Sequence, residues 1–452
     1  MKSTDFSQRF AQWFQPTGII NLARQTRWMI RQGKIDAFEF FVGLVFGQMS
    51  ALQLTLSAQA GCFTEPVSRQ GVHLRYNQRT VDFFHAGFDQ CLQKALEESP
   101  QPSLTQELAK HFEAVKLVDS SSFDCPESLA KIYPGCGGSA SIANCKLLLC
   151  YEYVRGQFQP LALLPGNRPD AGLADQLPPL LKANELILID KGFFKHKVLL
   201  QIDQQKAFFL MPLHRSSSRW IPQAEGPPVE LDLAAVLRHT NENVVEWPTV
   251  WLGDPAKGLA VRMVAYRLKE ETANRHRAAL RKSAEKKGRT PTAAALELAG
   301  WIILITNAPA EKLPRSAMAC LYRVRWQIEL IFKQCKSLLR LDVTKARKNV
   351  YRVQCEIWGR LIAAVVLFAW HSHLQAALST RSKREISFGQ VACHFQQRGM
   401  TLALQLIQGG QSLIDALRRW WRHLLQTTIK GRQRTRQTTW ELLNEHWLDL
   451  AK

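Results

Sequence analysis

Four polar side chains of different chemistry recur at helical spacing in one segment of the chain, residues 321–341. This segment contains no Gly or Pro, so it predicts one uninterrupted helix. At about 100° per residue, four of its side chains fall within about 60° of arc. They are Tyr322, Arg325, Glu329 and Lys336. A phenol, a guanidinium, a carboxylate and an ammonium group therefore share one narrow stripe of the predicted helix.

The helix alone leaves two interpretations of this stripe open. Arg325 and Glu329 are an i,i+4 pair, as are Glu329 and Lys333. Such pairs usually form a solvated edge and contribute roughly 0.3 kcal/mol each. The neighbouring face of the helix is apolar and must be buried, so the same side chains could instead border a functional site. Suitable acids elsewhere in the chain would favour the second interpretation.

Two aspartates end apolar runs that predict strands. Residues 114–118 lead into Asp119, and residues 185–189 lead into Asp190. Asp124 is a rival first acid, but we prefer Asp119 because it directly ends the apolar run. A strand-terminal Asp is also a common cap or turn residue. The order strand, hairpin, helix, strand, with acids at two strand ends and Glu329 on a later helix, predicts an α/β fold with a ribonuclease-H-like catalytic core.

The spacing Y-x2-R-x3-E-x6-K of the stripe resembles the signature of bacterial DDE transposases of the insertion-sequence-4 group. All four positions match, and Trp326 follows the arginine, as an aromatic residue often does in that group. The resemblance implies that Glu329 is the third metal-binding carboxylate and that Tyr322, Arg325 and Lys336 contact DNA. It also implies double-stranded DNA as the substrate, both the inverted ends of a transposon and its target.

Asp119, Asp190 and Glu329 would then form one catalytic, metal-binding set. Cleavage of a phosphodiester needs a deprotonated nucleophile and a neutralised leaving oxygen, and two divalent cations about 3.5–4 Å apart supply both. Carboxylate oxygens suit Mg²⁺, for which Mn²⁺ can substitute. We therefore expect two Mg²⁺ ions per active site. We also expect the protein to act as a homodimer assembled on the DNA.

Two tryptophans lie near the glutamate in sequence. Trp301 precedes Glu329 by 28 residues, and Trp326 precedes it by three. Members of the group that form a DNA hairpin hold a flipped base on tryptophans at such places. Stacking a base on indole contributes roughly 1–3 kcal/mol, which offsets much of the cost of unstacking. Trp301 could equally be a buried strand residue.

The composition indicates a folded protein with a polyanionic partner. The 452 residues carry a formal net charge of +21, and 46% of them are hydrophobic, which favours nucleic acid as the partner. The first residues lack a signal-peptide pattern, and the longest apolar run, 361–370, is shorter than the ~20 residues that span a bilayer. Ten scattered cysteines include no CxxC pair. We expect a cytoplasmic, nucleoid-associated protein that does not bind membranes.

Changes in hydrophobic periodicity predict three domains. Residues 1–110 are helical and are expected to bind the transposon end. Residues 111–345 form the expected catalytic core, and residues 346–452 form a C-terminal helical region that packs on the core and could dimerise or contact DNA. Arg69 and Arg75 of the first domain are candidate DNA contacts, although a basic helix face is often only solvated.

The catalytic core is expected to be interrupted by a β-rich insertion at about residues 204–300. Such an insertion is similar to the one that the insertion-sequence-4 group carries between its second Asp and its Glu. A charge-dense, mainly basic stretch inside it, residues 269–289, either is solvated or faces DNA.

These patterns favour one function and leave two others open. The preferred function is metal-dependent cleavage at transposon ends and strand transfer into target DNA by a cut-and-paste route, through a hairpin. The first alternative is a ribonuclease-H-like nuclease or resolvase without strand transfer. The second is a catalytically inactive, domesticated DNA-binding protein, which the presence of all three acids disfavours.

Overall fold

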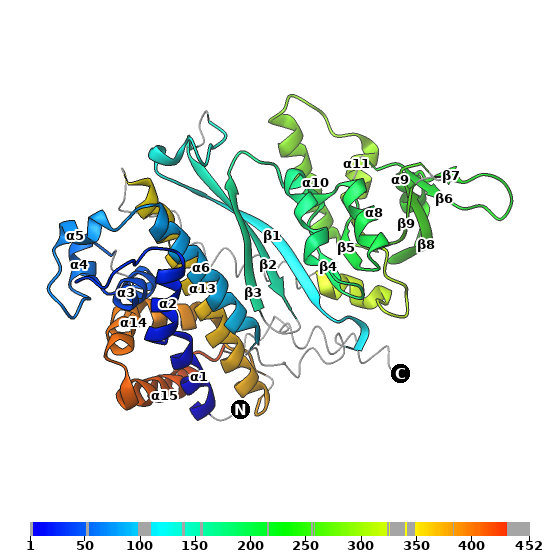
Figure 1. The fold of residues 1–452 in the computed structure, drawn as a ribbon. Coiled ribbons are helices and arrows are strands. Elements are labelled where there is room, and N and C mark those ends of the chain that lie inside the picture. The colour runs from blue at the N-terminus through cyan, green and yellow to red at the C-terminus, as the bar shows by residue number, and fades with distance from the viewer. Residues whose placement is uncertain are drawn as a thin grey trace. The chain divides into compact units, whose positions relative to one another are not determined.

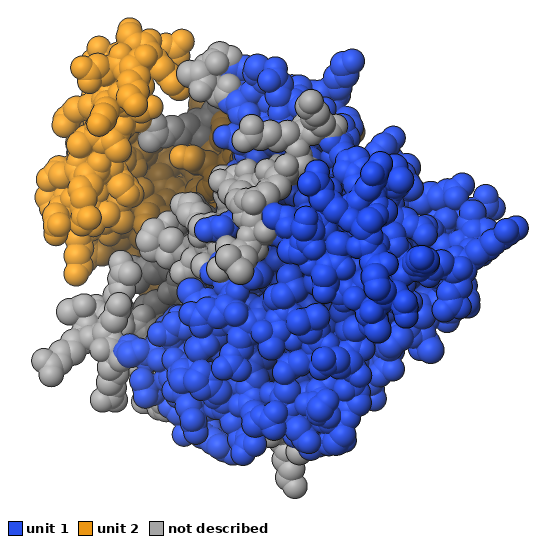
Figure 2. Space-filling model, turned by 90° about the vertical axis from the view of Figure 1, so that its left-hand side faces the viewer, with its two compact units in different colours: residues 1–106, 119–168, 328–438 blue, residues 107–118, 169–327, 439–452 orange. Residues whose placement is uncertain are grey.

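The chain folds into two compact units, coloured separately in Figure 2. Unit 1 comprises residues 1–106, 119–168 and 328–438, and unit 2 comprises residues 107–118, 169–327 and 439–452. The structure is a computed structural model. It describes residues 3–50, 54–97, 110–137, 141–153, 157–214, 217–254, 256, 258–322, 325, 340, 349–382 and 384–431.

Unit 1 is mainly helical (Figure 1). Its helices are α1 (Ser3–Trp13), α2 (Pro16–Gln25), α3 (Ala37–Met49), α4 (Leu56–Ala60), α5 (Arg69–Leu74), α6 (Gln78–Glu97), α13 (Val350–Ser379), α14 (Phe388–Gln408) and α15 (Gly410–Thr427). Strand β1 (Val115–Asp124) enters the unit at Asp119 and is followed by the 3-10 turn η2 (Glu127–Leu129) and by the antiparallel pair β2 (Asn144–Glu152) and β3 (Gln157–Pro165).

Helix α13 is the centre of the core of unit 1. The ring of its Trp370 lies 5.1 Å from Phe6, 5.3 Å from Phe10 and 5.1 Å from Trp420 between centroids. Burying each of these large rings stabilises the unit by roughly 1.5–3 kcal/mol, and together they join α1, α13 and α15. Among the described residues α13 alone is long and apolar enough to cross a membrane, but 67% of its most apolar stretch is buried inside the protein.

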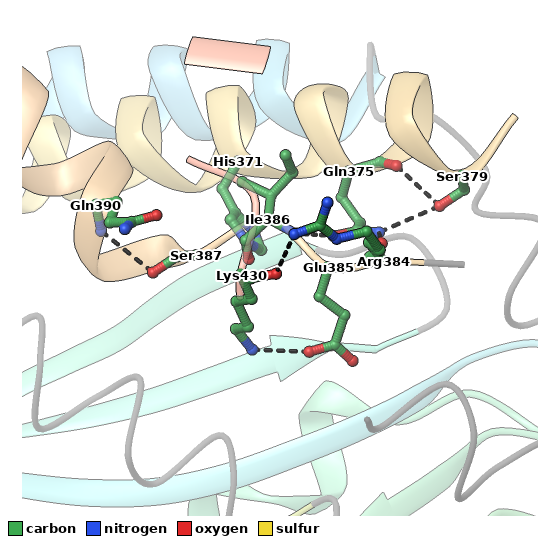
Figure 3. Close-up of polar contacts among 9 residues, drawn as sticks. All are labelled: His371, Gln375, Ser379, Arg384, Glu385, Ile386, Ser387, Gln390 and Lys430. Atoms are coloured by element: carbon green, nitrogen blue, oxygen red, sulfur yellow. Dashed lines mark hydrogen bonds and ion pairs between the residues drawn. The ribbon is translucent and has the colours of Figure 1, made fainter. Parts of the chain in front are cut away.

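A polar network fixes the connection between α13 and α14 (Figure 3). Nε2 of His371 contacts the carbonyl oxygen of Ile386 at 3.1 Å, and the amide of Ile386 donates to Oε1 of Gln375 at 2.7 Å. Glu385 and Lys430 form an ion pair at 2.7 Å. Burial lowers the pKa of His371 to about 4, so its ring is neutral at pH 7. The network therefore ties the chain at Lys430 to the helical core.

Unit 2 is built on strands in the order β1, β4, β5, β10, β9, β8, β6, β7. Strands β1, β4 (Leu186–Leu188) and β5 (Phe208–Pro212) are parallel neighbours. Every following pair is antiparallel: β10 (Trp301–Thr306), β9 (Leu259–Arg267), β8 (Val244–Leu252), β6 (Arg219–Ile221) and β7 (Val229–Glu230). Strand β4 is wholly buried, as expected for a parallel strand covered on both faces.

Short helices surround these strands (Figure 1). They are η3 (Asp170–Gln176), η4 (Pro178–Leu180), η5 (Lys191–Phe193), α8 (His196–Gln204), α9 (Leu233–His239), α10 (Glu270–Glu285) and α11 (Ala293–Leu298). Residues 315–322 are also helical and begin directly after Pro314. This start agrees with the helix predicted around the polar stripe, most of which lies outside the described residues.

The predicted α/β class is confirmed, and the mixed sheet with flanking helices fits a ribonuclease-H-like core. Strand β1 does not end at Asp119 as predicted but continues to Asp124. Its polar second half stays extended because β2 lies beside it in the strand order. The domain boundaries stay predictions.

Candidate active site

Asp190 stands where strand β4 gives way to a tight turn. Its backbone is extended (φ −79°, ψ 159°), and its Oδ2 accepts from the amide of Gly192 at 3.3 Å, so that it caps the 3-10 turn η5. The side chain is still 36% exposed. The cap therefore holds a solvent-accessible carboxylate at the carboxyl end of a buried parallel strand, where α/β sheets collect ligands.

Two side chains that follow Pro314 reach the same carboxylate. The hydroxyl of Tyr322 donates to Oδ1 of Asp190 across 3.4 Å, and Nη2 of Arg325 lies 3.7 Å from that oxygen. The guanidinium carbon of Arg325 lies 5.2 Å from the centroid of the Tyr322 ring. Two residues of the predicted stripe and the second predicted acid thus form one cluster.

Burial affects the side chains of Arg325 and Tyr322 in this cluster. Only 10% of the Arg325 side chain is exposed. Burial raises the pKa of Tyr322 to about 12, with Arg325 lowering it and Asp190 raising it further. The phenol is therefore a proton donor at neutral pH. Both contacts to Oδ1 are longer than a strong hydrogen bond of about 2.8 Å, so the carboxylate keeps acceptor capacity for another ligand.

Strand β9 anchors the helical segment that carries Tyr322. The guanidinium of Arg262 donates to the carbonyl oxygen of Leu313, and the hydroxyl of Tyr266 donates to the carbonyl oxygen of Arg315. Arg262 is buried, which lowers its pKa and makes its hydrogen bonds costly to break. Strand β9 therefore helps to position the helical segment that reaches Asp190.

Asp119 and Asp124 both belong to β1. Asp119 is half-buried in mid-strand, and its Oδ1 accepts from the amide of Ser120 at 2.9 Å. Asp124 is exposed, and its Oδ1 accepts from Nδ2 of Asn144 on β2 at 2.9 Å. Each of the two acids thus has a local hydrogen bond, and the choice of Asp119 as the first acid stays a prediction.

Comparisons with known proteins identify the family. A family model described as "Transposase DDE domain" matches residues 110–366, more than half of the chain, and this stretch includes Asp119, Asp190, Tyr322 and Arg325. The chain belongs to the DDE transposase family. The prediction of a bacterial insertion-sequence transposase of the DDE type is confirmed.

Transposases of bacterial insertion sequences match nearly the whole chain. The transposase of IS231F from Bacillus thuringiensis subsp. israelensis is 26% identical over 461 residues, which cover 97% of this chain and 94% of that protein. The transposase of IS1151 from Clostridium perfringens is 24% identical, with 97% and 95% covered. A solved piggyBac transposase synaptic complex with hairpin DNA has a TM-score of 0.41 at 12% identity, with 87% and 76% covered.

An acid that the sequence analysis did not single out, Asp170 at the start of η3, lies beside the turn that follows Asp190. Its Oδ2 lies 3.3 Å from the point where a side chain on Gly192 would begin, and Oδ2 of Asp190 lies 3.7 Å from that point. A larger residue at position 192 would therefore crowd both carboxylates. No sequence signal marks Asp170, because it follows Pro169 in a loop rather than an apolar run.

Trp301, Arg69 and Arg75 are the other candidates for contacting DNA that the structure describes. Trp301 begins β10 and is 6% exposed, and the guanidinium carbon of Arg267 lies 4.4 Å from its ring centroid. A flipped base could reach that ring face only if Arg267 moved. Arg69 is exposed at the start of α5, whereas Arg75 stacks over Trp28 at 5.3 Å. The basic segment around them forms two helices, α5 and α6.

Glu329, Lys336 and Trp326 lie outside the described residues. Among the residues that are described, no group of three His, Cys, Asp or Glu side chains could hold a metal ion. The assignment of Asp119, Asp190 and Glu329 as metal ligands stays a prediction. The family as a whole uses divalent metal ions, and oxygen ligands of this kind suit them.

Proposed function

We propose that this chain cleaves DNA at the inverted ends of its own element and joins those ends to target DNA by a cut-and-paste route. The observation that carries the proposal is the cluster of Asp190, Tyr322 and Arg325 within the DDE domain. It combines an accessible carboxylate with a buried cation and a phenol. Those are the groups needed to hold a metal ion and to orient a phosphate beside it.

The register of the parallel strands supports pairing Asp119 with Asp190. Leu117 of β1 is the partner of Leu188 of β4, and each aspartate follows its leucine by two residues. We propose that they bind metal together with Glu329.

The proposed cofactor is a pair of Mg²⁺ ions, with Mn²⁺ as a substitute. Asp190 is suited to be a ligand of such an ion, since its side chain is partly exposed and its contacts at 3.3, 3.4 and 3.7 Å are long. When bound, the ions would activate the nucleophile and neutralise the leaving oxygen. Arg325 holds the carboxylate from its buried side, and Tyr322 keeps its proton and orients the same oxygen.

The remaining roles follow the family resemblance. We propose that Arg325, Tyr322 and Lys336 contact phosphates near the scissile bond, and that Arg69 and Arg75 contribute to end binding. Trp301 or Trp326 would stack a flipped base if the excised end passes through a hairpin. The active species would be a homodimer on DNA, working at the nucleoid.

The test uses duplexes that carry the inverted repeats flanking the gene. With Mg²⁺ or Mn²⁺ we expect nicking at the repeat end, a hairpin from a pre-nicked end, and joining to a target plasmid; EDTA should abolish all three. Nicking without joining would replace the proposal by a nuclease or resolvase. Binding without any metal-dependent cleavage would leave a DNA-binding protein. Nicking and joining without a hairpin would remove only the tryptophan roles.

A further inference from the structure

Helix α10 separates its charges between its two halves. Its N-terminal half carries both acids of the first turn, Glu270 and Glu271, which pair with Arg277 at 2.7 Å and with Arg275 at 3.1 Å. The cations of this half are therefore neutralised within the helix. What remains of the net positive charge of α10 lies toward its C-terminal end.

The N-terminal half is also the half that is anchored to unit 2. Ala273 is buried, and Nε of Arg277 donates to the carbonyl oxygen of Leu296 on α11 at 3.3 Å. Nη1 of Arg277 also donates to Oδ1 of Asn274 at 2.9 Å. In Figure 1 the other end of α10 stands away from the strands of the unit, where the loop to α11 begins. The N-terminal half of α10 is thus packed on the rest of unit 2, whereas the C-terminal end is exposed to solvent.

The presented end carries five exposed cations within nine residues and a single acid, Glu285. The cations are Arg281, Lys282, Lys286, Lys287 and Arg289. None of the five forms an ion pair with any residue that the structure describes. Lys282 and Lys286 are four residues apart on the same face, an arrangement of like charges that destabilises an isolated helix.

The backbone at this end is fixed without help from those side chains. Gly288 adopts φ +61°, its amide donates to the carbonyl of Glu285 at 2.9 Å, and the amide of Arg289 donates to the carbonyl of Ala284 at 3.0 Å. This is the Schellman arrangement that satisfies the last carbonyls of a helix. The lysine and arginine head groups are therefore not needed as caps, and they are held on an ordered turn.

We propose that this cluster, the α10 cation end (Arg281, Lys282, Lys286, Lys287 and Arg289), binds the phosphates of double-stranded DNA. The inference rests on the proposed function, in which DNA is the substrate, and adds a second contact surface to the Asp190 cluster. A membrane is a poorer partner, because none of the large exposed hydrophobic side chains found among the described residues lies on α10. Phosphate contacts of this kind do not read sequence, so they would hold flanking or target DNA as well as transposon ends.

The experiment compares two triple variants of the full chain that remove equal charge. Lys286→Gln, Lys287→Gln and Arg289→Gln alter the α10 cation end; Lys182→Gln, Lys197→Gln and Arg238→Gln remove three exposed cations elsewhere in unit 2. Binding of a fluorescent 30-base-pair duplex of arbitrary sequence is measured over a range of salt concentrations, together with melting temperature. The slope of log affinity against log salt reports the number of phosphates neutralised.

We expect the α10 variant to lower that slope by about three and the control to leave it nearly unchanged, with equal melting temperatures. The charge-preserving set Lys286→Arg, Lys287→Arg and Arg289→Lys should keep the slope of the unmodified protein. Equal losses in both Gln variants would overturn the inference in favour of net charge. A lower melting temperature of the α10 Gln variant with an unchanged slope would mean that the cations stabilise the helix and do not bind DNA, which would also overturn the inference. Failure of the unmodified protein to bind DNA would instead refute the proposed function.

An anionic vesicle of phosphatidylserine and phosphatidylcholine tests the other source of phosphate. Loss of vesicle binding with an unchanged DNA slope in the α10 variant would overturn the assignment to DNA. Loss of DNA binding alone supports it.

Discussion

Asp119 and Asp190 look alike in sequence and are built differently in the fold. Each follows an apolar run of strand type. Strand β4 ends at Leu188, and Asp190 then caps a 3-10 turn and receives Tyr322 and Arg325. Strand β1 continues past Asp119 for five more residues. An apolar run thus marks where burial ends, but the hydrogen-bonding neighbours decide where the strand ends.

The difference predicts how each acid tolerates substitution. Asp190 is held by its own side chain, through the cap on Gly192 and through two partners from a distant helix. Asp119 is held by the backbone of a long strand, and its side chain contacts the adjacent amide of Ser120. Removing the side chain of Asp190 should therefore cost both structure and chemistry, whereas removing that of Asp119 should cost mainly chemistry.

The largest expected effect is at Asp190. Asp190→Asn keeps an acceptor for Gly192 but removes the charge, and cleavage should fall by more than about 100-fold, since even indirect partners of a metal cost about 10–100-fold. Asp190→Ala should in addition lower stability by about 1 kcal/mol through loss of the cap. Nicking rates and melting temperatures measure the two effects. Asp175→Asn, at an exposed ion pair with Lys195, is the control and should cleave normally. Normal cleavage by Asp190→Asn would show that Asp190 is not a metal ligand.

The second effect separates Asp119 from its rival. Asp119→Asn should reduce nicking by more than about 100-fold, whereas the melting temperature should change little, because an amide oxygen can still accept from the amide of Ser120. Asp124→Asn should retain cleavage, since an amide can still contact Asn144. The reverse pattern would make Asp124 the first carboxylate and would show that the end of the strand, not the end of the apolar run, marks the acid.

These two acids also show what sequence can and cannot predict here. Apolar runs located the strands before Asp119 and Asp190, and helical spacing placed Tyr322 and Arg325 on one side of a helix, because both depend on local periodicity. The extension of β1 to Asp124 was missed because it depends on the neighbouring strand β2.

Contacts between separate elements could not be predicted from local sequence patterns for the same reason. The approach of Asp170 to Gly192 and the Arg267 guanidinium over Trp301 join residues from separate elements. Neither arrangement leaves a periodic signal in one segment. The predicted roles of Glu329, Lys336 and Trp326 lie outside the described residues, so they stay predictions.

A smaller effect is expected at Arg325, which touches the carboxylate at 3.7 Å from a buried position. Arg325→Lys keeps the charge but loses the planar fork, and we expect a 10- to 100-fold loss of nicking, as is about usual for a residue that supports a metal ligand. Arg325→Gln should lose more, because it removes the cation that lies 3.7 Å from Asp190. Arg315→Lys, at the exposed start of the same helical segment, serves as the control. Equal activity of Arg325→Lys and Arg315→Lys would mean that Arg325 forms only a structural ion pair and has no part in cleavage.

The smallest effect is expected at Tyr322. Its hydroxyl donates to Asp190 across 3.4 Å, a long bond that should contribute less than the roughly 1.5–3 kcal/mol of a good hydrogen bond to a charged group. Tyr322→Phe keeps the ring that stacks under Arg325 at 5.2 Å, so only the bond is lost. We expect nicking to fall by about three- to tenfold, near 1 kcal/mol in the barrier.

Tyr322→Ala removes the ring as well and should approach the loss seen with Arg325→Lys, since Arg325 then lacks its packing partner. A double variant, Tyr322→Phe with Arg325→Lys, measures the coupling between them. If both side chains act by orienting Oδ1 of Asp190, the double variant should lose less than the product of the single losses. Strict multiplicativity would mean that the phenol and the guanidinium act on different parts of the substrate, and the cluster would then be two contacts and not one device for holding a carboxylate.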